Sequence, residues 1–130
     1  MKLIEVVAAV IIQDKKVFVA QRNGKGEVGF KWEFPGGKIE PGESNESALI
    51  RELKEELCID AAIGNFLLTV HHQYQTFNLK MHCYLTTIIS GTIQLSEHID
   101  SRWLQINEIN SVDYADADKP IVEYIQRILK

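Results

Sequence analysis

The order of apolar and polar residues along the chain predicts several short strands and two helices. Six mostly apolar segments of strand length predict β-strands, at residues 5–12, 17–22, 32–34, 65–74, 79–88 and 102–106. Short polar or glycine-containing segments between them predict turns, at residues 13–16, 75–78 and 90–91. Residues 23–31 predict a longer polar loop, and residues 107–110 predict a single helical turn.

Two further segments have apolar residues at helical spacing. The first helix is predicted at residues 44–57, where Ser44 or Asn45 can cap the first turn. Its predicted core-facing residues are Leu49, Ile50, Leu53 and Leu57. The second is predicted at residues 118–130, with Asp118 as its N-cap and Pro120 in its first turn. Its predicted core-facing residues are Ile121, Val122, Ile125, Ile128 and Leu129.

Strands on both sides of one helix, closed by another helix, predict an α/β fold with a mixed sheet between helices. A length of 130 residues, with 45% hydrophobic and 25% charged residues, fits one soluble domain over residues 1–130. The apolar run at residues 4–12 is too short to span a membrane, so we expect a buried central strand and a cytoplasmic protein. A net charge of −4 without a basic run argues against a nucleic-acid polymer as partner.

The first predicted helix carries a group of acidic residues on one side. Glu52, Glu55 and Glu56 stand at positions i, i+3 and i+4, so their side chains gather next to the apolar side. Their mutual repulsion would destabilise an isolated helix, and such a local conflict often marks function. Mg²⁺ and Mn²⁺ prefer oxygen ligands and would resolve the repulsion. The alternative is a solvated acidic face without a ligand.

The residues around this acidic group support the prediction of a metal site. The Arg51 guanidinium can hold the Glu43 carboxylate by two parallel hydrogen bonds, although it could also bind phosphate. Gly36 and Gly37 follow Pro35 and give the backbone the freedom to turn a carbonyl toward a cation. An ordinary turn would also explain the two glycines.

The spacing of these residues resembles the signature of the Nudix hydrolases, which cut diphosphate linkages attached to nucleosides. The matching positions are Gly37, Glu43, Arg51, Glu52, Leu53, Glu55, Glu56 and Ile59. Cys58 departs from the pattern, because the family usually has glycine there. Glycine favours the left-handed conformation that often ends a helix, so we expect either a different helix end or local strain of about 1–2 kcal/mol. The resemblance implies a single-domain α/β/α sandwich.

Residues outside the signature look like the MutT-like branch and most like bacterial CTP pyrophosphohydrolases. The positions similar to the MutT-like branch are Arg22, the segment 32–38, Glu97 and the segment 118–120. The segment 4–9 and the pair Glu97-His98 look closest to the CTP pyrophosphohydrolases. This resemblance implies a Mg²⁺-dependent hydrolase, with Mn²⁺ as a possible substitute, that converts a nucleoside triphosphate such as CTP or dCTP to the monophosphate and pyrophosphate. Oxidised dGTP is a close rival as substrate.

The resemblance also implies roles for individual residues. The implied metal ligands are the Gly36 carbonyl, Glu52, Glu55, Glu56 and Glu97. Glu52 is the first candidate for the general base and Glu97 the second, with Arg51 and Glu43 supporting the catalytic site. The implied substrate-binding residues are Arg22, Trp32, Phe34, Gly37, Lys38 and Asp118. Asp118 suits the exocyclic amine of cytosine or the edge of a guanine derivative, unless it serves only as a helix cap.

Two other functions remain open at this point. The chain could cleave ADP-ribose or another nucleoside diphosphate conjugate, which releases no pyrophosphate. It could also be a non-catalytic nucleotide-binding regulator, although the intact acidic group argues against a pure sensor. We expect a monomer or a homodimer.

Overall fold

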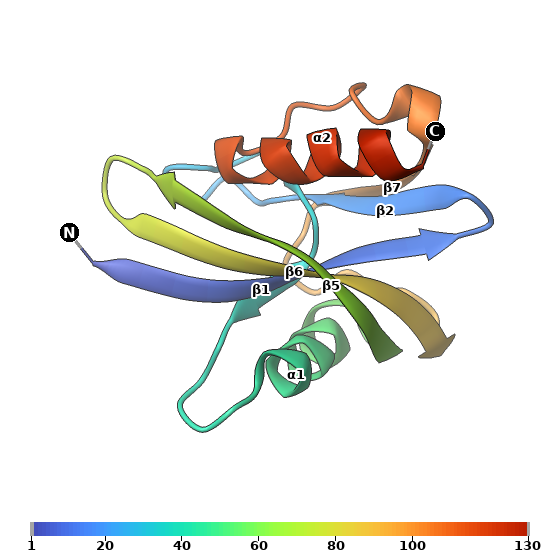
Figure 1. Cartoon of the computed structure of the whole chain (residues 1–130), viewed down its shortest axis with the longest axis horizontal. Helices are drawn as coiled ribbons and strands as arrows, with labels where there is room; N and C mark the ends of the chain where they lie inside the picture. The colour runs from blue at the N-terminus through green and yellow to red at the C-terminus, as the bar shows by residue number, and fades with distance from the viewer. Residues whose placement is uncertain (1, 130) are drawn as a thin grey trace.

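A mixed β-sheet lies between two helices in the computed structural model, which describes residues 2–129 (Figure 1). Its strands are β1 (Leu3–Gln13), β2 (Lys16–Gln21), β3 (Trp32–Glu33), β4 (Gly36–Lys38), β5 (Asp60–Gln73), β6 (Asn78–Ser90) and β7 (Asp100–Gln105). Its helices are α1 (Asn45–Leu57) and α2 (Lys119–Ile128), with short 3-10 turns η1 (Ile106–Glu108) and η2 (Asp116–Asp118). The predicted fold class is confirmed.

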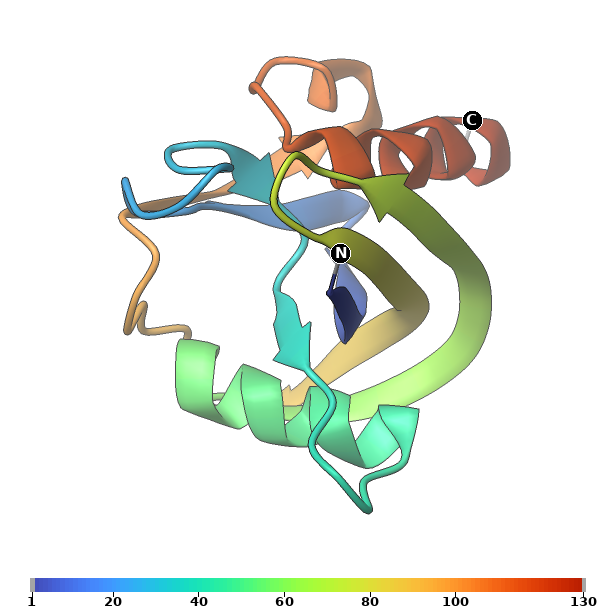
Figure 2. The ribbon, with the colours of Figure 1, turned by 90° about the vertical axis from the view of Figure 1, so that its left-hand side faces the viewer.

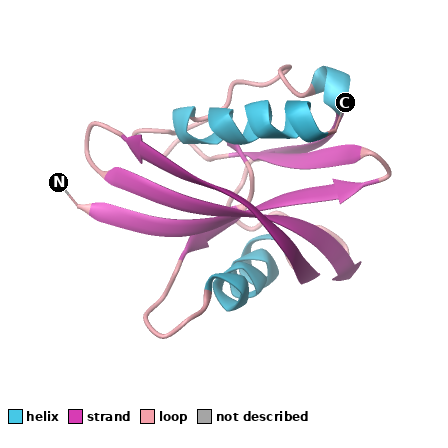
Figure 3. Ribbon diagram, in the orientation of Figure 1, coloured by secondary structure: helices cyan, strands magenta, loops and turns pink. Residues whose placement is uncertain are grey.

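Strand β1 is the centre of the sheet, whose order is β3-β2-β1-β6-β5. It pairs in parallel with β6 and antiparallel with β2 and β4, while β7 pairs antiparallel with β2 (Figure 3). Helix α1 covers one face and α2 the other (Figure 2). Val7, Ala9 and Ile11 pack with α1, whereas Ala8 and Val10 pack with α2. Burial on both faces explains why β1 is almost continuously apolar.

Helix α1 agrees with its prediction except for one residue on its apolar side. Ser44 is the N-cap, and its Oγ accepts a hydrogen bond from the Ser47 N–H at 3.1 Å. The predicted core residue Ile50 is 44% exposed, because its position lies at the edge of the buried side that Leu49 and Leu53 occupy. The helix ends at Cys58, which adopts the left-handed conformation with φ of 60°.

The strands differ from the prediction at two places. The segment Gly36–Lys38 forms β4, where no strand is predicted, and β5 begins at Asp60 instead of residue 65. Asp118 occupies the predicted N-cap position of α2 but makes no side-chain capping bond, because its carboxylate is turned toward another segment. In α2, Ile128 is 48% exposed, and the predicted end at residue 130 lies outside the described residues. No helix in residues 2–129 has the length and apolar character needed to cross a membrane.

Candidate functional site

One cavity of about 680 Å³ brings together most of the residues that the sequence singles out. Among its lining residues are Arg22, Phe34, Gly36, Gly37, Lys38, Arg51, Glu52, Glu55, Glu56, Glu97 and Asp118. Its polar end is formed by β4 and α1, and apolar side chains from β1 and β6, including Val6, Ala8 and Met81, line another part. The cavity therefore has an acidic end, formed by Glu52, Glu55 and Glu56 of α1 and the residues around them, and apolar side chains elsewhere in its wall.

The predicted pair of Glu43 and Arg51 is present. Arg51 Nε and Nη2 donate to Glu43 Oε2 and Oε1 at 2.8 and 2.9 Å. Hydrogen bonds from Arg51 lower the pKa of Glu43 to about 2, and the Glu40 N–H, which donates to Glu43 Oε1 at 2.9 Å, acts in the same direction. Arg51 Nη2 also donates to the Lys38 carbonyl at 3.0 Å, so the arginine joins α1 to the loop that precedes it.

Gly36 and Gly37 are required because other groups approach their backbone closely. A Cβ atom at Gly36 would collide with the Val7 carbonyl of the neighbouring strand. A Cβ atom at Gly37 would collide with the carboxylate of Glu52. The two glycines therefore let β4 pair with β1 and let the first acidic side chain of α1 lie directly against the β4 backbone.

The acidic residues of α1 divide into two groups. Arg51 Nη1 donates to Glu52 Oε1 at 2.9 Å and to Glu55 Oε2 at 3.3 Å, so both carboxylates lie toward the arginine. Glu56 lies on the other side, where Glu33 and His98 offer ligand atoms within 4.8 Å of one another and of Glu56. Within residues 2–129, this trio is the group of acidic and histidine side chains whose ligand atoms lie this close together, and it shares Glu56 with the predicted trio on α1.

Glu56 is the most electrostatically perturbed carboxylate at the acidic end. Burial raises the pKa of Glu56 to about 8, and repulsion from Glu33, Glu52 and Glu97 adds to the effect. Its Oε1 atom is buried and has no hydrogen-bond partner among the described residues. Burial also raises the pKa of Glu52. A buried carboxylate oxygen without a partner, surrounded by like charges, is the kind of ligand that a hard divalent cation satisfies.

Sequence reasoning missed two residues of the acidic end. Glu33 accepts from Arg22 Nη1 through Oε1 at 3.0 Å and from His98 Nε2 through Oε2 at 2.9 Å. The side chain of His98 is only 4% exposed and lies between the carboxylates of Glu33 and Glu56. No local spacing links Glu33 to His98, because they come from distant parts of the chain. The only signal is the position of His98 next to Glu97.

Asp118 lines the cavity beside Phe34. Its side chain is almost fully buried, and Oδ2 accepts from the Phe34 N–H at 2.9 Å. Burial raises the pKa of Asp118 well above its ordinary value, and the nearby Glu33 adds to this shift. Asp118 thus stands at the N-cap position of α2, but its side chain does not cap the helix. The carboxylate instead fixes η2 to the segment after β3 and borders the cavity.

The two aromatic residues predicted to bind substrate have different surroundings. The Trp32 ring is 6% exposed and belongs to the core, with the Arg102 guanidinium 4.9 Å from its centre, so it is not part of the cavity wall. Trp32 lies in β3, which pairs with β2, and its side chain packs in the core cluster that also contains residues of α2. Phe34 does line the cavity, and its ring stacks on Tyr114 with centroids 5.8 Å apart.

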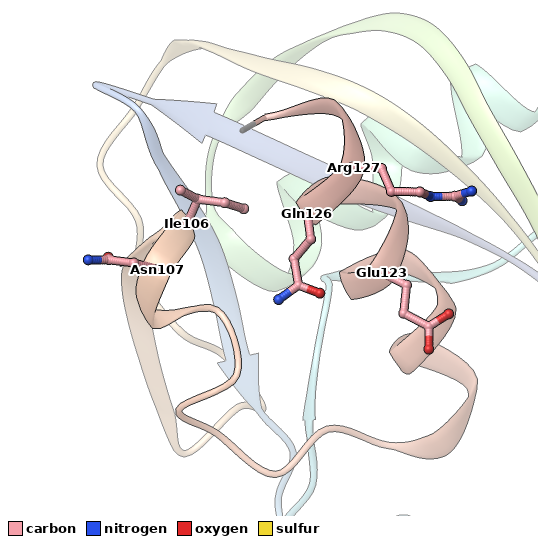
Figure 4. A pocket seen from close by; sticks show the side chains of 5 residues that line it. All are labelled: Ile106, Asn107, Glu123, Gln126 and Arg127. Carbon is pink, nitrogen blue, oxygen red and sulfur yellow. The ribbon is translucent and has the colours of Figure 1, made fainter.

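A second hollow lies on the outer side of α2 (Figure 4). It is lined by Ile106, Asn107, Glu123, Gln126 and Arg127. None of the predicted site residues lies there, and its charged groups are one acid and one base on α2. The larger concentration of carboxylates is in the cavity between β4, α1 and η2, which is therefore the candidate site.

Comparisons with known proteins show what this chain is similar to in sequence and fold. The NUDIX domain family matches residues 6–124. The CTP pyrophosphohydrolase of Escherichia coli (strain K12) is 39% identical over 123 residues, which cover 95% of this chain and 91% of that protein. The 8-oxo-dGTP diphosphatase of Proteus vulgaris is 45% identical over 83 residues, which cover 62% of this chain and 74% of that protein. The solution structure of the E. coli ORF135 protein superposes with a TM-score of 0.83 at 37% identity, covering 98% of this chain and 91% of that one.

Proposed function

Because the chain belongs to the NUDIX domain family and is a Nudix hydrolase, we propose that it converts CTP or dCTP to the monophosphate and pyrophosphate. The observation that carries this proposal is the lining of the main cavity, which combines the carboxylates of α1 with the buried carboxylate of Asp118 and with apolar side chains. A nucleoside triphosphate matches this lining, because it joins charged phosphates to a flat, partly apolar nucleobase.

The phosphates would lie at the acidic end. The residues that would hold a divalent cation there are the Gly36 carbonyl, Glu52, Glu55, Glu56 and Glu97. The unpartnered oxygen of Glu56 and the oxygen-rich donor set fit Mg²⁺ or Mn²⁺. Bound there, the cation would neutralise the charge that develops on phosphate oxygens. Lys38, which also lines the cavity, and Arg22 would add positive charge near the phosphates or the sugar.

Glu52 is the first candidate for the base that takes a proton from the attacking water. Burial raises its pKa toward the range in which a carboxylate accepts a proton effectively. Arg51 donates to Oε1, which fixes the carboxylate and leaves Oε2 available. Glu97, which is exposed at the rim of the cavity, is the second candidate.

The nucleobase of the substrate would lie against Phe34 and Asp118. A carboxylate accepts hydrogen bonds and therefore suits the exocyclic amine of cytosine. The same carboxylate also suits the ring N–H and amine edge of an oxidised guanine. Hydrolysis of 8-oxo-dGTP is therefore the second candidate function, favoured by Asp118 and by the similarity to the P. vulgaris diphosphatase.

A pyrophosphate-release screen with identified products tests the proposal. The substrates are the common NTPs and dNTPs, 8-oxo-dGTP and ADP-ribose, each with and without Mg²⁺. We expect the highest kcat/KM with CTP or dCTP, dependence on Mg²⁺, and a loss of orders of magnitude in Glu56→Gln. A preference for 8-oxo-dGTP would select the second candidate. If no triphosphate is hydrolysed, with or without cleavage of ADP-ribose, both candidate functions are refuted.

A further inference from the structure

The acidic residue Glu97 lies outside α1, in the loop at residues 91–99 that joins β6 to β7. Its side chain is exposed, and it borders a small cavity of about 50 Å³ that Glu56 and His98 also line. An exposed side chain on a loop keeps a fixed position only if the backbone on both sides is held. The residues immediately before and after it therefore decide where its carboxylate can go.

The part of the loop before the acidic residue is attached to the C-terminal end of α1. The last carbonyl groups of a helix have no partner within the helix and need one elsewhere. The Ser96 N–H and Oγ donate to the Glu56 carbonyl at 3.2 and 3.3 Å, and Oγ also donates to the Glu55 carbonyl at 3.2 Å. The Gln94 N–H donates to the Leu57 carbonyl at 3.0 Å. Ser96 thus attaches the loop to the same turn of α1 that carries the acidic residues.

The part of the loop after the acidic residue is attached through His98. Its side chain is 4% exposed, its Nε2–H donates to Glu33 Oε2 at 2.9 Å, and its Nδ1 lies 3.8 Å from Glu56 Oε2. Glu33 is itself held by Arg22 at 3.0 Å. A buried polar side chain is costly to separate from its partner, so this attachment resists movement.

Resting on the proposed function, we propose that Ser96 and His98 are positioning residues that hold Glu97 beside Glu56. They stand directly before and after Glu97 in the sequence, and the Asn23 amide also donates to the Glu97 carbonyl at 3.4 Å, so the Glu97 backbone moves only when at least one of these attachments breaks. Ser96 contacts the main chain of Glu56, and His98 lies beside its carboxylate. The acidic residue outside the signature is thereby held at the same small cavity as the last acidic residue of α1.

A double-mutant cycle tests whether His98 acts through Glu97. Glu97→Gln and His98→Ala should each lower kcat by about 10- to 100-fold, the range typical of groups that orient metal ligands. The double variant should be no slower than Glu97→Gln alone, because residues acting as one unit are not additive. His98→Gln, whose amide nitrogen can still donate to Glu33, should recover most of the activity. Multiplicative losses, or wild-type kcat in His98→Ala, would overturn the proposal.

Two measurements without turnover separate this proposal from the proposed function. In His98→Ala, the amides of Gln94 and Ser96 should exchange hydrogen faster, and Mn²⁺ should bind about tenfold more weakly. The matched control is His71→Ala, an exposed histidine on β5, which should change neither. If the wild-type protein hydrolyses no nucleotide but both shifts appear, the proposed function fails and the positioning role stands. Unchanged amide exchange in His98→Ala would exclude the positioning role.

Discussion

At the scale of single residues, the pair of Arg51 and Glu43 links the loop after β4 to helix α1. Arg51 also donates to Glu52, so the same guanidinium that fixes the loop orients the candidate base. Five N–H donors in a rigid plane make arginine suited to this task, and lysine would not replace it. Of the two roles that the sequence spacing of Arg51 allows, the contacts therefore favour the structural one, in which it positions the carboxylates of the site.

This pair predicts how stability depends on pH. The pKa of Glu43 falls from its ordinary 4.5 to about 2 in the folded protein, because Arg51 stabilises the ionised form. The contribution of Glu43 to stability is present above pH 4.5 and is lost as the pH falls from there toward 2. In urea unfolding between about pH 6 and pH 3, the free energy of unfolding should therefore decrease less steeply in Glu43→Gln than in wild type. Glu123→Gln, at an exposed position of α2, serves as control, and equal slopes for Glu43→Gln and wild type would contradict the assignment.

The residues that the sequence identified and those that it missed differ in how far apart they are in the chain. Glu52 and Arg51 belong to one helix, so their spacing alone predicts their arrangement. Glu33 and His98 meet only because β3 and the loop before β7 both pack near β2. No pattern within one segment contains that information. For the same reason, the sequence could not decide whether Asp118 caps a helix or faces the cavity.

At the scale of elements, the helices were easier to predict than the ends of the strands. Helix α1 has both a capping serine and apolar residues at helical spacing, which are local signals. Strand β4 is Gly-Gly-Lys, a poor strand former, and exists because glycine lets it approach β1. The start of β5 was missed because its pairing with β6 contains register shifts, so the alternation of apolar residues is interrupted there.

The end of α1 provides a prediction at this scale. Cys58 adopts φ of 60°, a conformation that is unfavourable for every residue with a Cβ atom, and its side chain is exposed. Cys58→Gly should raise the free energy of unfolding by about 0.5–1 kcal/mol, because relief of strain exceeds the added entropy of the unfolded chain. Chemical denaturation measures this difference. Cys58→Ala is the matched control, since it removes the thiol and keeps the Cβ atom, and it should not be stabilised. A Cys58→Gly variant less stable than wild type would show that the helix end carries no strain.

At the scale of the whole molecule, the cavity extends between parts of the chain that belong to opposite faces of the sheet. Its acidic residues Glu52, Glu55 and Glu56 come from α1, and Asp118 comes from η2, which precedes α2. Arg22 and Glu33 connect these residues electrostatically, because they are paired with each other and the charge of Asp118 acts on the Arg22 guanidinium. This arrangement requires the complete sheet, because neither helix alone supplies all of the carboxylates that line the cavity.

Substitution of Asp118 should therefore change the substrate preference without disturbing the hydrolysis proposed at the acidic residues of α1. In Asp118→Asn, the new side chain would keep one oxygen that accepts from the Phe34 N–H. It would present an amide N–H₂ where the second carboxylate oxygen lies. A donor on the nucleobase would therefore lose its acceptor. We expect this variant to lower kcat/KM for CTP and dCTP by about tenfold relative to a triphosphate whose base does not donate there. The melting temperature should not fall, because the carboxylate makes no helix-capping bond and a buried charge is replaced by a neutral group of the same shape.

Pyrophosphate release from CTP, dCTP, dTTP and 8-oxo-dGTP, measured beside thermal unfolding, checks both expectations. An unchanged order of substrates would place base recognition elsewhere in the cavity, whereas a reversed order among the cytosine and oxidised-guanine substrates would identify Asp118 as the residue that distinguishes them.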